Sequence, residues 1–272
     1  MSPQLTPQPP VSSDLTRQTA LYVVLGAACV TSTGLLFVRL APFTLGFLAG
    51  ALVPYCTVCL IAVARIADSH PFDRFGAANA LTLSRLVICS LIGGLAFELA
   101  IHETAPPEGV AWVFCVMAVA ALVIDGLDGY AARKANMTSA FGGRFDMEVD
   151  ALQILLLCIV AVALGKAGLW ILIGGALRYA YEFASVFWPA LQRPLPPSFR
   201  RKLVSVVKGS TLAGLLAPII VPPFSTVVAA AALGLLIYSF IVDVVWLAID
   251  DRRARRLSSR DVFSPARKTA PG

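Results

Sequence analysis

Charged residues are scarce in this 272-residue chain, because Asp, Glu, Lys and Arg together make up only 14% of it. Soluble domains contain about 25% charged residues and about 45–50% apolar ones, whereas 58% of this chain is hydrophobic. The only two histidines, His70 and His102, lie alone in expected loops, so we expect neither to have a metal or catalytic role. These scarcities exclude an ordinary soluble protein and predict a membrane protein.

Cysteine forms no disulfide pattern in this sequence. Each of the six cysteines lies inside an apolar run, at Cys29, Cys56, Cys59, Cys89, Cys115 and Cys158. Cys56 and Cys59 form a C-x-x-C, but a redox motif of this kind belongs to a soluble fold. We therefore interpret both as small residues that pack between helices.

Long apolar runs account for most of the chain. There are eight, at 20–38, 43–64, 80–101, 109–127, 151–164, 169–191, 203–221 and 226–249. They are continuous, whereas the strands of a membrane barrel are segments of about 10 residues with alternating polarity. Because lipid offers no hydrogen bonds to the backbone, continuous runs must be helical. The fold class expected is all-α, a polytopic transmembrane helical bundle, with no signal peptide to remove.

The net charge of +6 reflects the position of the basic residues along the chain. With the N-terminus inside, almost all of the basic residues fall in the internal loops and the C-terminal tail, and only Arg39 and Lys166 lie outside. This asymmetry follows the positive-inside rule with an even number of spans. We expect both termini in the cytoplasm and no nucleic-acid partner. The alanine-rich composition and short loops are typical of a bacterial inner-membrane protein.

The two ends of the chain are polar. Residues 1–19 are rich in Pro, Gln, Ser and Thr, which predicts a disordered N-terminus. Residues 251–272 form a basic tail that either holds anionic lipid headgroups or only sets topology.

One stretch between the fourth and fifth runs breaks the apolar pattern. It reads DGLDGYAARKANMTSAFGGRFDMEVD and carries four aspartates at the internal ends of two spans. Carboxylates at a membrane boundary are costly and indicate function. At 3.6 residues per turn, two helix faces result, one with Asp125, Asp128, Gly129, Ala132 and Arg133, the other with Gly142, Asp146 and Asp150. Two helices can thus direct four carboxylates into one cleft.

Four neighbouring carboxylates repel one another unless cations compensate them. Oxygen ligands without Cys or His favour Mg²⁺ or Mn²⁺ over zinc, and two such ions would balance four aspartates. Gly129, Ala132 and Gly142 leave room for a ligand, and Arg133 can hold a phosphate oxygen. A divalent-cation transporter is the alternative, although transporter sites typically lie near the midplane.

The pattern D-x-x-D-G-x-x-A-R, eight residues, G-x-x-x-D-x-x-x-D resembles the signature of the CDP-alcohol phosphatidyltransferases at all eight fixed positions. The resemblance implies transfer of a phosphatidyl group from a CDP-linked lipid, usually CDP-diacylglycerol, to a hydroxyl acceptor, with release of CMP. It also implies a six-span core at 76–250. The two extra spans at 20–75 have no counterpart in the family; homodimer contact, lipid access and anchoring all stay open as their role.

The resemblance also implies roles for individual residues. Asp125, Asp128 and Asp146 resemble the metal ligands, and Asp150 resembles the ligand of the second metal that accepts the acceptor's proton. Gly129, Arg133 and Gly142 resemble the CDP contacts. Thr82, in an N-A-L-T segment followed by Arg85, and Ser139 resemble nucleotide contacts, with a helix cap or loop hydroxyl as the alternative.

The acceptor is left open by the sequence. A phosphorylated acceptor needs a second basic cluster, for which the candidates are Arg178, Lys202 and Lys208, with Arg200 and Arg201 beside them. Glu182 lies four residues after Arg178 and is placed to neutralise it. Serine, choline or another amino alcohol would need no such cluster.

Overall fold

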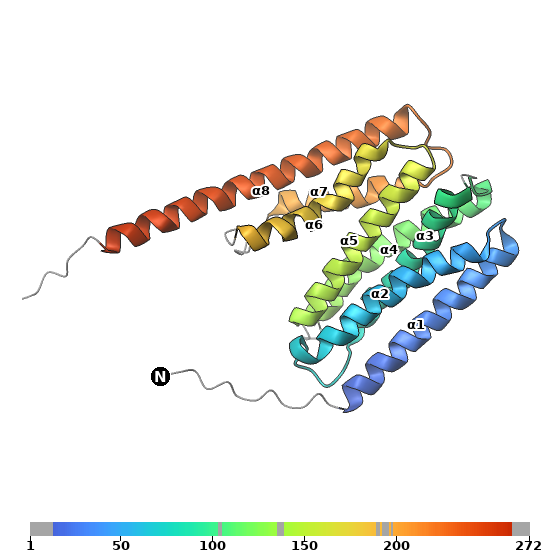
Figure 1. Cartoon of the computed structure of the whole chain (residues 1–272), viewed down its shortest axis with the longest axis horizontal. Coiled ribbons are helices and arrows are strands. Elements are labelled where there is room, and N and C mark those ends of the chain that lie inside the picture. The colour runs from blue at the N-terminus through green and yellow to red at the C-terminus, as the bar shows by residue number, and fades with distance from the viewer. Residues whose placement is uncertain are drawn as a thin grey trace, which may run out of the picture.

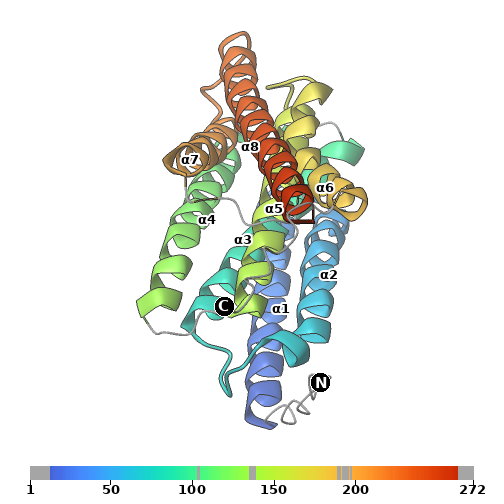
Figure 2. The same cartoon turned by 90° about the vertical axis from the view of Figure 1, so that its left-hand side faces the viewer.

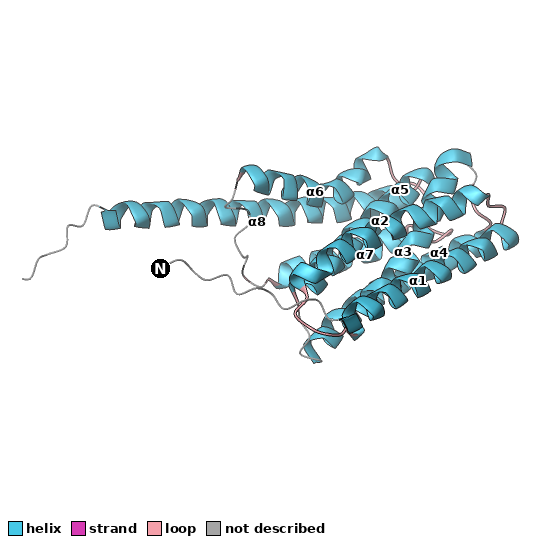
Figure 3. Cartoon of the chain, turned by 60° about the horizontal axis from the view of Figure 1, so that its bottom comes forward, coloured by secondary structure: helices cyan, strands magenta, loops and turns pink. Residues whose placement is uncertain are grey.

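The computed structural model describes residues 13–102, 105–134, 139–188, 191, 196 and 198–262. These residues form eight α-helices and one short 3-10 helix, with no strand among them. The elements are α1 Ser13–Leu40, α2 Leu45–Ser69, α3 Ala77–His102, α4 Glu108–Lys134, α5 Ala140–Ala163, η1 Leu169–Ile171, α6 Leu172–Phe187, α7 Phe199–Gly214 and α8 Phe224–Val262. Each apolar run of the sequence overlaps one helix, which confirms an all-α polytopic bundle (Figure 3).

Five of these helices are long and apolar enough to cross a membrane, namely α1, α2, α3, α4 and α8. The other three of the eight expected spans are helices in the structure, but they do not meet this measure of length and hydropathy. Helix α5 carries Arg144, Asp146, Glu148 and Asp150 in its first half, which lowers its hydropathy. Helices α6 and α7 have 16 residues each.

Helix boundaries depart from the apolar runs at two ends. Helix α1 begins at Ser13, so residues 13–19, which we expected to be disordered, are helical. Asp14 lies in the first turn, where a negative charge stabilises a helix, and Leu15 is buried. Helix α7 ends at Gly214, well before Val221, because Pro218 cannot continue the hydrogen-bond ladder of a helix.

Helix α3 is the centre of the bundle and packs against α1, α2, α4 and α5. Two thirds of its most apolar window is buried, against about a fifth in the other four long helices. Figure 1 shows α1, α2 and α5 side by side, with α6 and α8 toward the other edge, and Figure 2, turned by 90°, shows α4 beside α7. The C-terminal part of α8 extends beyond the bundle (Figure 1).

The contact between α2 and α3 is particularly close. A side chain at Gly94 would lie 2.7 Å from the Phe47 carbonyl oxygen, so only glycine permits this approach. At the start of α2, the buried Glu98 of α3 accepts hydrogen bonds from the Thr44 backbone N–H, at 2.8 Å, and from the Thr44 hydroxyl, at 2.9 Å. The second extra helix is therefore packed tightly against α3.

Lys166, one of the two basic residues expected outside, lies in the loop after α5 and is buried. Its ammonium donates to the carbonyl oxygens of Ala217, Pro218 and Ile220, which follow α7. Burial lowers the pKa of Lys166 below its usual value. Lys166 thus joins the loop after α5 to the turn after α7 by hydrogen bonds.

Candidate active site

Arg85 of α3 connects two of the signature aspartates. Its guanidinium is completely buried; Nη1 forms an ion pair with Asp125 of α4, and Nη2 lies 2.5 Å from the Asp146 carboxylate of α5. Nη2 also donates to the Asp146 backbone carbonyl at 3.0 Å. The two carboxylates are 40% and 41% exposed, so both keep a face that a ligand can reach. A buried cation requires such partners, since desolvation would otherwise be very costly.

Sequence reasoning gave Arg85 no role in the site, although the sequence carries a signal for one. Arg85 follows Thr82 by three residues in an apolar helix, and a cation inside an apolar run is itself evidence of function. Its two partners come from helices 40 and 61 residues further along the chain. Only the packing of α3 against α4 and α5 brings these groups together.

Asp150 lies one turn beyond Asp146 on α5 and is half-buried. It lies within electrostatic range of Lys208 of α7. Among the residues with described side chains, no three His, Cys, Asp or Glu side chains converge as a metal site does. The side chains of Asp128, Ala132 and Arg133, on α4, lie outside the described part of the structure.

The first turn of α5 fits closely against α3. The Ser139 hydroxyl accepts a hydrogen bond from the Gly142 N–H at 3.0 Å and so caps α5. A side chain at Gly142 would lie 3.0 Å from Oδ1 of Asn79 and 3.3 Å from the Ser139 hydroxyl. Gly142 therefore has a packing reason to be glycine, and Ser139 has a capping role, independent of any ligand.

Thr82 lies on α3 with its side chain buried. It donates to the Ala78 carbonyl at 3.1 Å. Gly129 lies on α4, one residue after Asp128. Both positions are at the same end of the bundle as Asp125 and Asp146.

His70 is a residue whose contacts sequence reasoning missed. It follows α2 and is buried, with its Nδ1 3.1 Å from the Ser139 hydroxyl and its Nε2 2.9 Å from the Arg74 carbonyl oxygen. Its ring also packs edge-on against Phe141 of α5. The second extra helix thus reaches the cap of the helix that carries Asp146. His102, also expected in a loop, is the last residue of α3.

The basic residues considered for the acceptor lie in different surroundings. Arg178 of α6 pairs with Glu182 at 2.9 Å, as their spacing indicated. Lys208 of α7 interacts electrostatically with both Asp150 and Arg178, and it lines a small cavity with Cys158 and Thr211. Lys202 is exposed at the start of α7.

Two further arginines near the start of α7 have partners of their own. Arg200 pairs with Asp243 of α8 at 2.5 Å and donates to the Ser239 hydroxyl at 2.6 Å. Arg201 donates to the Pro196 carbonyl. Of the acceptor candidates, Arg178 and Lys208 are therefore the ones that the fold places within electrostatic reach of one another, with Asp150 beside Lys208.

The chemistry of the donor set fits a hard divalent cation. Asp125, Asp146 and Asp150 offer only oxygen, and hard cations such as Mg²⁺ and Mn²⁺ prefer oxygen ligands. Arg85 holds Asp125 and Asp146 in fixed positions while leaving each about 40% exposed. Partly exposed carboxylates on two helices can thus be reached by a cation.

Comparison with known proteins agrees with this geometry. The family model for CDP-alcohol phosphatidyltransferase matches residues 75–250, which include Arg85, the signature aspartates and helices α3 to α7 with most of α8. Neither curated proteins nor solved structures show a match to the chain. The matched segment is well over half of the chain. This membrane protein therefore belongs to the CDP-alcohol phosphatidyltransferase family.

Proposed function

We propose that the protein transfers a phosphatidyl group from CDP-diacylglycerol to a hydroxyl acceptor in phospholipid biosynthesis. The family supports a transferase that uses a CDP-alcohol, which also speaks against the cation transporter left open above. The single observation that carries the finer proposal is the Arg85 bridge. It holds the aspartates of α4 and α5 at one end of the bundle, with part of each carboxylate exposed.

The proposed cofactors are two Mg²⁺ or Mn²⁺ ions, held by Asp125, Asp128, Asp146 and Asp150. When bound, such ions neutralise the diphosphate and stabilise the negative charge that develops as CMP leaves. Arg85 contributes a further fixed positive charge behind two of the ligands. Its role is to orient the carboxylates before substrate arrives, so that little reorganisation is needed during the reaction.

In the proposed reaction, an oxygen of the acceptor hydroxyl attacks the lipid-side phosphorus. The new O–P bond replaces the bond from that phosphorus to CMP, and CMP leaves with the electron pair. A carboxylate oxygen of Asp150 accepts the hydroxyl proton, a role that suits a half-buried carboxylate one turn from the metal ligands. Thr82, Gly129, Ala132, Arg133, Ser139 and Gly142 are the proposed contacts of the CDP-lipid.

The acceptor is proposed to approach Asp150 from the side of α6 and α7. Lys208 and Arg178 supply positive charge there, whereas Lys202 is exposed at the start of α7 and suits an entrance. A phosphate-bearing alcohol would pair with Lys208, while an amino alcohol would be repelled by it. The charge of Lys208 thus favours an acceptor, and hence a product lipid, that carries an additional phosphate.

Both termini and the active site are proposed to face the cytoplasm of a bacterial inner membrane. Cysteines introduced at Thr104 and Ser198 of a cysteine-free variant should be labelled from opposite sides, Thr104 from outside and Ser198 from the cytoplasm. Labelling with a membrane-impermeant maleimide on intact cells measures this. The reverse pattern would contradict the proposed orientation.

The proposed activity is tested with purified protein in detergent. CDP-diacylglycerol, Mg²⁺ and a panel of acceptors should release CMP with one acceptor class, and mass spectrometry should identify the new lipid. The matched control is Asp125→Asn, which removes one proposed ligand charge without changing side-chain size. Absence of CMP release with every acceptor from a folded protein, or equal release from the control, would overturn the proposal.

A further inference from the structure

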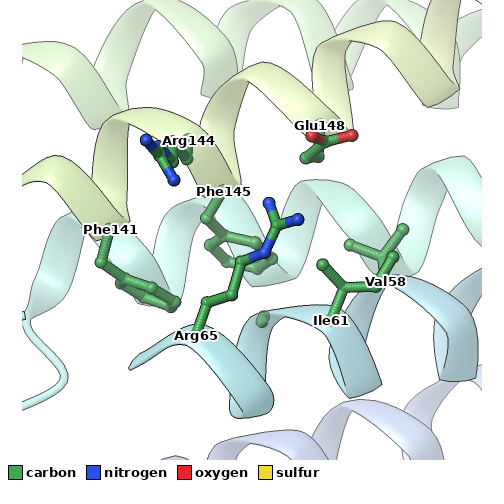
Figure 4. Close-up of a pocket in the computed structure, with 8 residues that line it drawn as sticks. Val58, Ile61, Arg65, Phe141, Arg144, Phe145 and Glu148 are labelled. Atoms are coloured by element: carbon green, nitrogen blue, oxygen red, sulfur yellow. The ribbon is translucent and has the colours of Figure 1, made fainter. Parts of the chain in front are cut away.

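A groove between α2 and α5 combines apolar walls with two arginines at one end. Figure 4 shows Val58 and Ile61 of α2 opposite Phe141 and Phe145 of α5. Arg65 extends from α2 toward α5, and Arg144 and Glu148 project from α5 on either side of it (Figure 4). We call this feature the α2–α5 groove.

The groove continues along the bundle, away from the arginines. A second cavity of about 600 Å³ shares Val58, Ile61 and Glu148 with the first and runs on between α2, α3 and α5. Its walls include Val53, Phe97 and Leu156. Cavities of about 300–1,000 Å³ are the size at which proteins hold small organic ligands. Apart from Glu148, where the two cavities meet, and Thr57 and Tyr179, the lining of the larger cavity is apolar, and the two arginines lie in the smaller one.

The groove is separate from the candidate active site. Successive residues of a helix are about 100° apart, so Glu148 is directed about 160° away from Asp146 and Asp150 on α5. Asp146 faces Arg85 of α3, whereas Arg144 and Glu148 face α2. A molecule in the groove would therefore lie behind α5 and would not contact the proposed CDP-lipid site.

Both arginines lie near the ends of their helices. Arg65 is one residue before the end of the candidate span Leu45–Ile66, and Arg144 is in the second turn of α5. Arginine side chains at the ends of spans reach toward phosphate groups while their stems stay in apolar surroundings. Two arginines against Glu148 leave a net charge of +1, which matches one phosphodiester.

We propose that the α2–α5 groove binds an anionic membrane phospholipid. One acyl chain lies against Val53, Phe97 and Leu156, and the headgroup phosphate lies between Arg65 and Arg144. One wall of the site is α2, which is outside the segment that matches the family model, so lipid binding gives this extra helix a function of its own. The bound lipid fills the space between α2 and α5, on the far side of α5 from the aspartates.

Binding to purified full-length protein in detergent is measured by native mass spectrometry with dioleoyl phosphatidylglycerol. Each of Arg65→Gln and Arg144→Gln should weaken binding about fivefold, and the double variant about 25-fold, as expected for about 1 kcal/mol per basic residue. The matched control is Arg39→Gln, since Arg39 is an exposed arginine at the far end of α1. The control should bind as the unchanged protein does.

Two further arms separate the headgroup from the acyl chain. Dioleoyl phosphatidylcholine should bind at least fivefold more weakly than phosphatidylglycerol, and Val58→Trp, which fills the groove, should reduce binding with both arginines present. Inorganic phosphate at millimolar concentration should not displace the lipid. Equal binding of the two lipids, displacement by phosphate, or unchanged binding in the double arginine variant and in Val58→Trp would each overturn the proposal.

Discussion

Replacing Arg85 with methionine would remove the cation that joins Asp125 of α4 to Asp146 of α5. The substitution keeps an unbranched side chain of similar length in a position that is completely buried. It leaves two carboxylates near one another without a compensating charge. We therefore expect the metal-free variant to be less stable than the unchanged protein.

The magnitude follows from the exposure of the three groups. Two unit charges 4 Å apart interact by about 4 kcal/mol at an effective dielectric constant of about 20, and breaking a fully buried pair costs about 3–5 kcal/mol. Because the carboxylates are 40% and 41% exposed, solvent screens part of this energy. A loss of about 2–3 kcal/mol is expected, which lowers the Tm by roughly 5–10 °C.

Divalent cations should reverse much of this loss. Without Arg85, the two carboxylates repel each other and bind a cation with less competition, so saturating Mg²⁺ should raise the Tm of Arg85→Met more than that of the unchanged protein. Thermal unfolding in detergent, followed by tryptophan fluorescence with and without Mg²⁺, measures both the loss of Tm and its recovery. An unaltered Tm without Mg²⁺, or an equal Mg²⁺ shift in both proteins, would refute the reasoning.

Three other predictions test the remaining groups of the site. Asp146→Asn should abolish CMP release at every Mg²⁺ concentration while the protein stays monodisperse in detergent; full activity in excess chelator would contradict a metal requirement. Asp150→Asn should lower kcat by about 10²–10⁴, as for the loss of a general base, with CDP-lipid affinity retained; a parallel loss of affinity that Mg²⁺ restores would instead identify it chiefly as a metal ligand. His70→Ala removes the hydrogen bonds to Ser139 and the Arg74 carbonyl, so it should destabilise the protein by about 1–3 kcal/mol. It should also raise KM for the CDP-lipid more than it lowers kcat. His70→Gln should partly restore both the stability and the KM. An unchanged KM would show that the cap of α5 does not depend on His70.

Much of the fold follows directly from the apolar runs. Lipid forces the backbone to satisfy its own hydrogen bonds, so a continuous apolar run becomes a helix whatever its neighbours are. The apolar runs alone could not show, however, that α6 and α7 have only 16 residues each. Their ends depend on where Pro218 and the packing of α5 against α6 and α7 stop the helices.

The candidate site divides in the same way. The aspartates could be predicted because their spacing of three or four residues places them on one face of a helix, and the family could be predicted from the same string of residues. Local periodicity carries no information about which helices meet. The approach of Asp150 to Lys208 of α7 and the pairing of Arg200 with Asp243 therefore appear only in the folded bundle.

What the sequence determined by itself was thus the class of fold, the number of helices, the family and the signature aspartates, because each depends on composition or on residues within a few turns of one helix. Only the tertiary structure decided that Arg85 balances Asp125 and Asp146, that His70 reaches Ser139, and that α2 forms a groove with α5. These contacts join residues 40 to 90 positions apart in the chain. Side-chain packing between helices brings them together, and no local pattern in the sequence encodes that packing.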